Sequence, residues 1–211
     1  MTTLERPRDP VRTSSSALAS ALACCHDERT RALVEELRAA DATLVWHGAA
    51  VAQLSVAMGR RLGLVGERLV TLCRAGLLHD IGKRYVPREV LIKPGPLLSH
   101  ERQLVEAHAA VGATVLLQAG LLAEAAIVRS HHERWDGAGY PDRLRGDAIP
   151  LESRIMLVAD TFDAMTSDRA YRAAMPPATA IDEIEHAAGT QLDPSCAAVL
   201  RPAVSAVAAA A

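Results

Sequence analysis

Histidine and aspartate side chains recur beside apolar segments of this sequence. The pair His79-Asp80 directly follows the apolar run Ala75-Gly76-Leu77-Leu78, where a carboxylate would be costly to bury without a cation beside it. Neutral imidazole and carboxylate are ligands that hold divalent Mn, Fe, Ni, Co or Zn, and an aspartate can bridge two ions through its two oxygens. The pair therefore indicates a metal site.

Other metal-competent side chains lie on further predicted helices, each flanked by Ala, Val or Leu. These candidates are His47, His108, His131, His132 and Asp160. Helices that present such groups to one core can build a metal centre between them. Lys83 follows His79 by four residues and Asp80 by three, so on a continued helix it would project on the same side and reach a phosphate held by the metals.

Each candidate also has a purely structural interpretation. Taken alone, His47 and His108 suit hydrogen-bonded or partly exposed histidines. His131-His132 suits a surface pair, and Asp160 suits a helix cap or an ion pair with Arg154. The remaining histidines, His26, His100 and His186, stand in polar contexts and are not candidates.

The elements that must position these residues are helices. The chain of 211 residues is 50% hydrophobic but only 3% aromatic, with alanine and leucine supplying most of the apolar surface, which favours closely packed helices over a β-sandwich. Apolar periodicity predicts an all-α fold. Its helices are expected at residues 17–40 (as one or two), 44–62, 67–82, 99–119, 121–132, 151–167, 178–188 and 194–207.

Turn and cap residues divide these helices. Prolines at 87, 94 and 96 predict a loop with at most one short turn of helix, and residues 135–150 are too rich in Gly and Pro for regular structure. Ser99 is expected to cap the helix that carries His108. Residues 1–16 are expected to be disordered, residues 17–43 a helical lead-in, residues 44–200 the main helical domain and residues 201–211 an Ala-rich tail.

The composition excludes several classes of protein. With 23 Lys+Arg against 25 Asp+Glu there is no broad basic field for a long nucleic acid. Cys24, Cys25, Cys73 and Cys196 form neither a disulfide framework nor a zinc finger, and residues 1–16 lack the apolar run of an export signal, so a cytoplasmic location is expected. Residues 109–128 are the most apolar stretch that could be considered as a membrane span. Polar residues interrupt this stretch, so we expect two packed helices there and no membrane span.

Two runs of residues resemble the signatures of the HD-GYP family, a branch of the HD phosphohydrolases. They are residues 79–83 (HDIGK) and 131–141 (HHERWDGAGYP). The resemblance continues through residues 93–97, 154–160, 163–172 and 189–194, and so covers about residues 44 to 200. It implies an HD-domain helical bundle with a C-terminal GYP-type extension.

The resemblance also implies roles for individual residues. The implied metal ligands are His47, His79, Asp80, His108, His131, His132 and Asp160. Asp80 would bridge two ions and Lys83 would contact the substrate phosphate. The implied substrate-binding residues are Tyr140 in the loop 137–141, Asp163, Arg169 and Arg172. For Arg169 to face the site, the chain must turn near Ser167-Asp168, because nine residues on an unbroken helix would place it opposite Asp160.

One position departs from the family pattern. Members with three metals carry a glutamate four residues before the first histidine, and Thr43 stands there in this sequence. A hydroxyl is a poor substitute for a carboxylate ligand. We therefore expect two divalent ions. Fe and Mn are the preferred candidates, and Ni, Co and Zn are alternatives.

The implied activity is metal-dependent hydrolysis of a cyclic dinucleotide, above all the bacterial second messenger cyclic di-GMP, to the linear dinucleotide; a second cut to GMP is left open. One alternative is an HD phosphohydrolase acting on another phosphate ester, such as a nucleotide or an alarmone. Another is a non-catalytic module that binds the dinucleotide or protein partners such as diguanylate cyclases or signalling proteins. The sequence is silent on oligomeric state.

Overall fold

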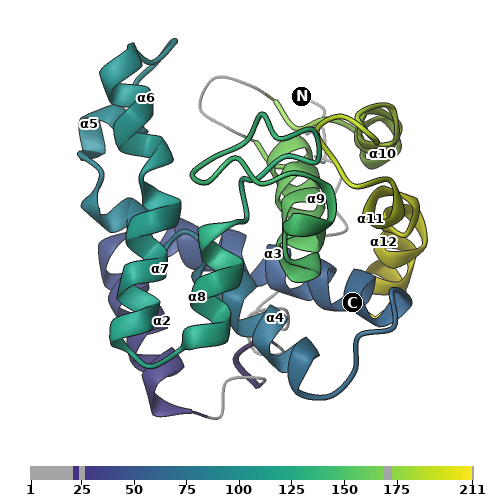
Figure 1. The fold of residues 1–211 in the computed structure, drawn as a ribbon, viewed down its shortest axis with the longest axis horizontal. Coiled ribbons are helices and arrows are strands. Elements are labelled where there is room, and N and C mark those ends of the chain that lie inside the picture. Colours follow the sequence, from purple (N-terminus) through teal and green to yellow (C-terminus); the bar gives the residue numbers. More distant parts are fainter. Residues whose placement is uncertain (1–20, 24–26, 169–172, 211) are drawn as a thin grey trace, which may run out of the picture.

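The computed structural model describes residues 21–23, 27–168 and 173–210 (Figure 1). Within these ranges the chain forms helices, turns and loops, with one isolated bridge between Ala188 and Leu192 and no β-strand. The all-α class is therefore confirmed. The helices are α2 (Glu28–Ala40), α3 (Ala42–Arg61), α4 (Glu67–Leu78), η1 (Ile81–Tyr85), α5 (Arg88–Leu91), α6 (Ser99–Glu106), α7 (His108–Gln118), α8 (Leu122–Arg129), η2 (Gly146–Ala148), α9 (Leu151–Thr166), α10 (Pro177–His186), α11 (Pro194–Ala198) and α12 (Leu200–Ala209).

Helix α3 is the hub of the bundle and contacts α2, α4, α9 and α12. Its apolar residues Val51, Leu54 and Met58 are buried, as their spacing of three and four predicts. Gly48 on α3 and Gly76 on α4 let these two helices approach closely. A Cβ on Gly48 would lie 2.6 Å from the Leu77 carbonyl oxygen, which is too close for any side chain. This approach brings His47, on α3, beside the end of α4.

Helices α7 and α8 pack against each other and close the other side of α4 and η1. Gly82 in η1 sits against the backbone carbonyl of His108, where a side chain would overlap the α7 backbone. The segment that carries Asp80 and Lys83 is thus pressed against the first turn of α7. Helix α4 ends at Leu78 and is followed by the 3-10 helix η1, so the expectation of one helix through residue 82 was wrong.

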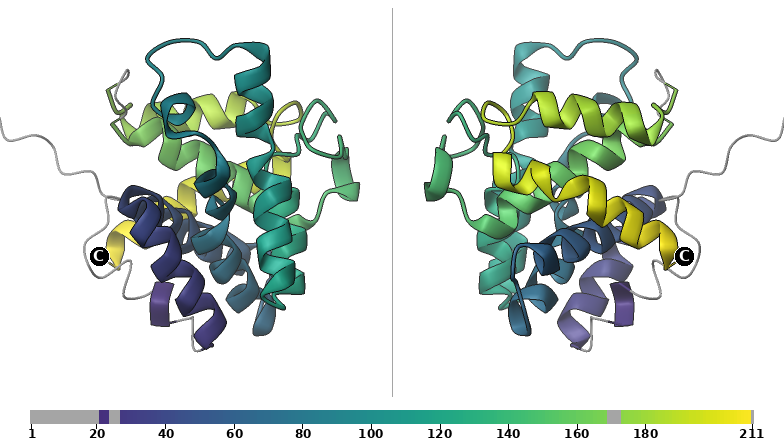
Figure 2. Two further views of the ribbon diagram at one scale, coloured as in Figure 1. Left: turned by 90° about the vertical axis from the view of Figure 1, so that its left-hand side faces the viewer. Right: turned by 90° about the vertical axis from the view of Figure 1, so that its right-hand side faces the viewer.

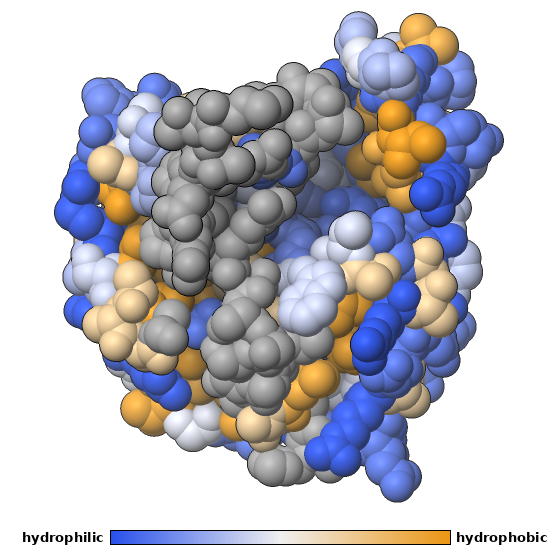
Figure 3. Space-filling view, turned by 180° about the vertical axis from the view of Figure 1, so that it is seen from behind, coloured by the Kyte–Doolittle hydropathy of each residue, from blue (hydrophilic) through white to orange (hydrophobic). Residues whose placement is uncertain are grey.

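The expected single helix over residues 99–119 is divided at Ala107 into α6 and α7. Helix α6 buries none of its residues, and together with α5 it extends away from the rest of the bundle (Figure 1). Figure 3 shows exposed hydrophobic residues at this end, next to a recessed hydrophilic area. Those exposed on α5, α6 and their flanks are Leu91, Ile92, Leu98 and Leu104.

The sequence suggested Ser99 as the N-cap of α6, but Ser99 is the first residue of the helix. Leu98 occupies the N-cap, and its N–H donates to a carboxylate oxygen of Glu101 at 2.7 Å. The same oxygen accepts from Lys93 Nζ at 2.6 Å. A carboxylate in the first turn satisfies the free N–H and interacts well with the helix dipole, which explains why the serine is not needed there.

The chain leaves two helices just before residues of interest. The sequence predicted that His131-His132 would lie on α8. Helix α8 ends at Arg129, however, so the pair lies in the turn after it. Helix α9 ends at Thr166, and Ser167 has an extended backbone with φ −101° and ψ 142°. The break expected near Ser167-Asp168 is therefore present. Arg169 and Arg172 themselves lie outside the described residues.

The C-terminal part of the chain forms α10, α11 and α12, the last two in place of one expected helix over residues 194–207. Helix α12 packs on α3 and buries Leu200, Ala203, Val204 and Val207, so most of the Ala-rich segment is a packed helix (Figure 2). The expected disorder of residues 1–16 falls outside the described residues. Among the described helices, none is both long and apolar enough to cross a membrane.

Candidate metal centre and its cleft

Two groups of side chains with metal-ligand atoms lie where α3, the start of α7 and the segments after α4 and α8 meet. In each group the candidate ligand atoms lie within 4.8 Å of one another. The first group is His47, His79 and Asp80, and the second is His108, His131 and His132. Residues from four separate stretches of sequence therefore meet at one place, as the sequence predicted.

Asp80 lies between the two groups. Its Oδ2 atom is 3.5 Å from His79 Nε2, and its Oδ1 atom is 3.5 Å from His108 Nε2. The side chain is only 1% exposed. One carboxylate oxygen thus faces each group, which is the arrangement that a bridging ligand requires.

Backbone carbonyl groups set the orientation of three histidines. The Nδ1 atoms of His79, His108 and His131 each donate to the carbonyl oxygen three residues earlier, at 2.8, 2.6 and 2.6 Å respectively. A carbonyl only accepts, so in the neutral ring the hydrogen is on Nδ1 and the lone pair is on Nε2. All three lone pairs are thereby directed at the centre.

His47 is held by carboxylates instead. Its Nδ1 atom lies 2.6 Å from Asp163 Oδ2, and its Nε2 atom lies 3.1 Å from Asp160 Oδ1. Burial alone would lower the pKa of His47, but the hydrogen bonds to Asp160 and Asp163 raise it to about 10. Both aspartates are on α9, so α3 and α9 are joined at this point.

Electrostatics keep the remaining groups in the forms that bind metals. Burial lowers the pKa of His131 well below its usual value and that of His132 to about 3, so both rings are neutral. Burial would raise the pKa of Asp80, but above all the positive charge of Lys83 holds it well below 3.8. His131 and His132 are therefore neutral and Asp80 is ionised, whereas the proton that Asp160 and Asp163 stabilise on His47 would be displaced when a metal binds there.

The donor set fits divalent ions. Among the described residues, His79 Nε2 and Asp80 Oδ1 are buried and have no hydrogen-bond partner. Such atoms are costly in a folded protein unless something neutralises or coordinates them. A lone pair and a carboxylate oxygen, both aimed at the middle of a cluster of imidazoles, are what Mn, Fe, Co, Ni or Zn would coordinate.

Lys83 extends from η1 to the edge of this cluster. Its Nζ atom donates to Asp80 Oδ2 at 2.7 Å, and a quarter of its side chain is exposed. Although η1 is a 3-10 helix and not a continuation of α4, the lysine still lies on the side of Asp80, as its spacing suggested. The cation is thus placed at the boundary between the ligand groups and solvent.

The loop after His132 forms the other wall of the site. Glu133 is 1% exposed, and its carboxylate accepts from the backbone N–H groups of Asp142 at 2.6 Å and Leu144 at 3.1 Å. A Cβ on Gly139 would lie 2.5 Å from the His132 carbonyl oxygen, so only glycine allows the loop to fold back this closely. The fold-back stacks the ring of Tyr140 on that of His132, with centroids 4.9 Å apart.

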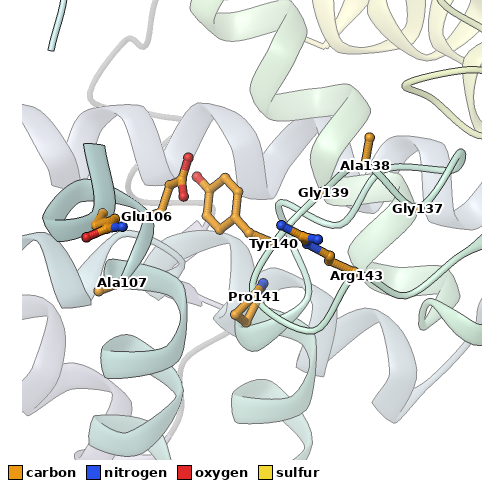
Figure 4. A pocket seen from close by; sticks show the side chains of 9 residues that line it. Glu106, Ala107, Gly137, Ala138, Gly139, Tyr140, Pro141 and Arg143 are labelled. Carbon is orange, nitrogen blue, oxygen red and sulfur yellow. The ribbon is translucent and has the colours of Figure 1, made fainter. Parts of the chain in front are cut away.

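Tyr140 borders a cleft of about 570 Å³ (Figure 4). The cleft is lined by Gln103, Glu106, Ala107, Arg143 and residues 137–141. Burial raises the pKa of the Tyr140 hydroxyl, and the charge of Glu106 adds to the effect, so this hydroxyl stays protonated. A chamber of ligand size therefore adjoins the imidazole cluster.

The structure also shows the contacts of two further residues that the sequence analysis discussed. Asp163 was expected to bind substrate, and in the structure its carboxylate contacts the Nδ1 side of His47. Thr43 is exposed near the start of α3, where its hydroxyl donates to Asp41 at 2.6 Å, so it is engaged in capping the helix.

Two residues that the sequence did not single out contribute to the site. Glu133 shapes the loop and Glu106 lines the cleft. Glu133 stands inside the HHERWDGAGYP run of residues 131–141, directly after the histidine pair. Glu106 precedes His108 by two residues and carries no sequence signal of its own.

Comparisons with known proteins show which proteins this chain resembles. A model of the HD domain family matches residues 15–196. The chain is 40% identical, over 160 residues, to "3'3'-cGAMP-specific phosphodiesterase 3" of Vibrio cholerae, and 40% identical, over 146 residues, to "Cyclic di-GMP phosphodiesterase response regulator RpfG" of Xanthomonas campestris. These alignments cover 75% and 66% of this chain but only 35% and 38% of the relatives, so the chain spans little more than a third of their length.

A solved structure shows the same fold. It is described as a HDG"Y"P protein from Bdellovibrio bacteriovorus and superposes with a TM-score of 0.67 at 17% identity. The superposition covers 97% of this chain and 75% of the other. The helical arrangement is therefore one that this structure shares.

Proposed function

Because this chain belongs to the HD domain family, we propose that it hydrolyses a 3′–5′ phosphodiester bond of a cyclic dinucleotide, cyclic di-GMP above all, and releases the linear dinucleotide. The observation that carries the proposal is the placement of Asp80 between two groups of ligand atoms, with one oxygen toward each. Relatives that are 40% identical and named as cyclic dinucleotide phosphodiesterases supply the substrate class.

The proposal includes two divalent ions. His47, His79 and Asp80 would hold one, and His108, His131 and His132, with Asp80 shared, would hold the other. Asp160, which contacts His47 Nε2 at 3.1 Å, would complete the first site. When bound, such ions lower the pKa of water from 15.7 to about 7 and neutralise charge on a phosphate. Thr43 supplies no carboxylate for a third ion, and Fe and Mn are our preferred candidates for the two.

The remaining residues bind and orient the substrate. The Lys83 ammonium is compact and lies beside Asp80, so it would donate to a non-bridging phosphate oxygen as negative charge builds up there. The stacked rings of His132 and Tyr140 form one side of the site, next to the cleft. Arg169 and Arg172 are proposed phosphate ligands from outside the described residues.

Turnover by the metal-replete protein tests this proposal. Protein loaded with Mn²⁺, or with Fe²⁺ under nitrogen, is mixed with cyclic di-GMP, 3′3′-cGAMP, cyclic di-AMP, nucleotides and an alarmone, and the products are separated by chromatography. We expect linear dinucleotides from at least one cyclic substrate. Asp80→Ala should abolish the reaction, whereas Asp182→Asn, on the exposed face of α10, should not alter it.

Two other outcomes would reject the proposal in favour of specific alternatives. Hydrolysis of nucleotides or the alarmone without any cut in a cyclic dinucleotide would identify an HD phosphohydrolase of another phosphate ester. Binding of a cyclic dinucleotide by protein that carries two metals, without hydrolysis, would identify a module that passes a signal to a protein partner.

A further inference from the structure

The cleft beside the imidazole cluster has a charged group on each side of Tyr140. Glu106 stands at the C-terminal end of α6, and Arg143 stands on the loop beyond Tyr140, as Figure 4 shows. In the same view the Glu106 carboxylate points toward the hydroxyl end of the Tyr140 ring. The cleft thus presents a hydrogen-bond acceptor at one end and a cluster of donors at the other.

Neither charge is used elsewhere in the part of the chain that the structure describes. No hydrogen bond or ion pair engages Glu106 or Arg143 there, although most other charged groups around the site are paired. Glu106 is also absent from both groups of metal-ligand atoms. A half-buried carboxylate that is neither paired nor a ligand is free to bind a molecule that enters the cleft.

The backbone holds Arg143 in an unusual conformation. Its φ is 55°, the left-handed region that residues other than glycine seldom adopt. The neighbouring N–H groups of Asp142 and Leu144 donate to the buried Glu133, which fixes the loop in this form. These hydrogen bonds therefore fix the backbone at Arg143, next to the cleft.

We propose that this cleft holds a guanine base of the substrate and that Glu106 determines the preference for guanine. The inference rests on the proposed function, because a nucleoside attached to a phosphate at the ligand groups would extend past Tyr140 into the cleft. Guanine offers two adjacent donors, N1–H and N2–H₂, to the Glu106 carboxylate. Its O6 and N7 atoms are acceptors for the Arg143 guanidinium.

Adenine matches neither end of the cleft fully. Its N1 atom is an acceptor and would face a carboxylate that cannot donate. Its N7 atom is an acceptor, as in guanine, but its N6 amino group is a donor in the place of O6 and would face a guanidinium that cannot accept. Burying unmatched polar groups costs more than a matched pair gains, so discrimination is strongest where the site is built around hydrogen bonds. The cleft should therefore select cyclic dinucleotides that contain guanine.

The test compares binding and hydrolysis of cyclic di-GMP and cyclic di-AMP by metal-replete wild-type protein and by Glu106→Gln and Glu106→Ala. Binding is measured by calorimetry with Ca²⁺ in place of the active metal, and kcat/KM is measured with the active metal. Glu89→Gln removes the same charge from the exposed surface of α5, away from the cleft, and serves as the control.

We expect wild-type protein to prefer cyclic di-GMP by about 10- to 100-fold. Glu106→Gln and Glu106→Ala should reduce this ratio about tenfold or more, while Glu89→Gln should keep it. An unchanged ratio in both Glu106 variants, or no preference in the wild type, would overturn the inference and leave the proposed function intact. Preferential binding that depends on Glu106 without any hydrolysis would reject the proposed function but support the cleft, and absence of binding would reject both.

Discussion

The Nε2 atoms of His108 and His131 lie 3.3 Å apart, yet neither nitrogen has a hydrogen to share when both rings are neutral. Each ring donates through Nδ1 to a backbone carbonyl, and burial lowers the pKa of both imidazoles. Two lone pairs therefore face each other in the protein interior, next to a carboxylate oxygen of Asp80. A cation between them turns an unfavourable contact into coordination.

Removal of metal should consequently lower the thermal stability of the protein. At free metal of 100 times the dissociation constant, binding to the folded state alone contributes about 2.7 kcal/mol. For a chain of this size that corresponds to a fall in Tm of about 5–10 °C on chelation. Differential scanning fluorimetry before and after dialysis against EDTA, and again after adding Mn²⁺, measures the change.

The control for this prediction is His186→Ala, which changes an exposed histidine on α10. It should show the full effect of chelation, and His131→Ala should show a smaller one. A Tm that is the same with and without EDTA in the wild type would contradict our account of these lone pairs.

Lys83 should matter for the reaction but not for metal content. Its ammonium touches Asp80 from the solvent side, 2.7 Å from Oδ2, and is not placed as a ligand. Lys83→Ala should lower kcat about 10²- to 10³-fold and leave the metal content near that of the wild type. Asp80→Ala should lose both metal and activity. Metal analysis beside steady-state kinetics separates the two roles, and loss of metal from Lys83→Ala would show that the role assigned to Lys83 is wrong.

Asp163 should act as a positioning residue for His47. Its carboxylate is 2.6 Å from Nδ1, so it fixes the ring and leaves Nε2 directed at the first ligand group. Partners of this kind typically change metal affinity 10- to 100-fold. Competition titration of apo Asp163→Asn with a chromophoric chelator should show one ion bound about 10- to 100-fold more weakly and the second unaffected. If Asp163→Asn binds each of the two ions as tightly as the wild type does, the result would argue that Asp163 binds substrate instead.

The buried carboxylate of Asp193 should make stability depend on pH. Burial would raise its pKa, but contacts with Ser195 and with Arg154, at 2.6 Å, lower it below 3.8. A pKa lower in the folded than in the unfolded state means that the ionised carboxylate stabilises the fold above about pH 4, and that this contribution is lost as pH falls through the folded pKa.

Asp193→Asn should therefore destabilise the protein by about 1–3 kcal/mol at pH 7 and by clearly less at pH 3. Urea unfolding at both pH values measures the difference. Asp182→Asn, in an exposed pair with Arg201, should change stability by less than about 0.5 kcal/mol at either pH. A penalty for Asp193→Asn that stays constant down to pH 3 would exclude this linkage.

Local sequence signals predicted the helices and the imidazole cluster for physical reasons that the structure makes visible. The spacing of Val51, Leu54 and Met58 determines which face of α3 is buried, and His47, four residues before Val51, lies on the same face, with its Nε2 atom 3.1 Å from Asp160 on α9. The break after Thr166 follows from residues that favour turns. These properties depend on neighbours within one or two helical turns.

Other features depend on contacts between distant residues, which no local pattern reveals. Asp163 contacts a histidine 116 positions away, so its place behind His47 could not be distinguished from a place in the pocket. Glu106 lines the cleft only because the chain breaks at Ala107 and the loop bearing Tyr140 folds back to meet it. The break itself was missed because both halves of residues 99–119 are good helix formers.

The number of metal ions per chain tests the central claim most directly. Protein purified under nitrogen, without chelators or a metal-affinity step, is analysed by inductively coupled plasma mass spectrometry beside the Asp80→Ala variant. We predict about two Fe or Mn ions per wild-type chain and fewer than about 0.2 in the variant, because Asp80 faces both ligand groups. A wild-type protein without bound transition metal, which also takes up none when Fe²⁺, Mn²⁺ or Zn²⁺ is supplied, would contradict the account.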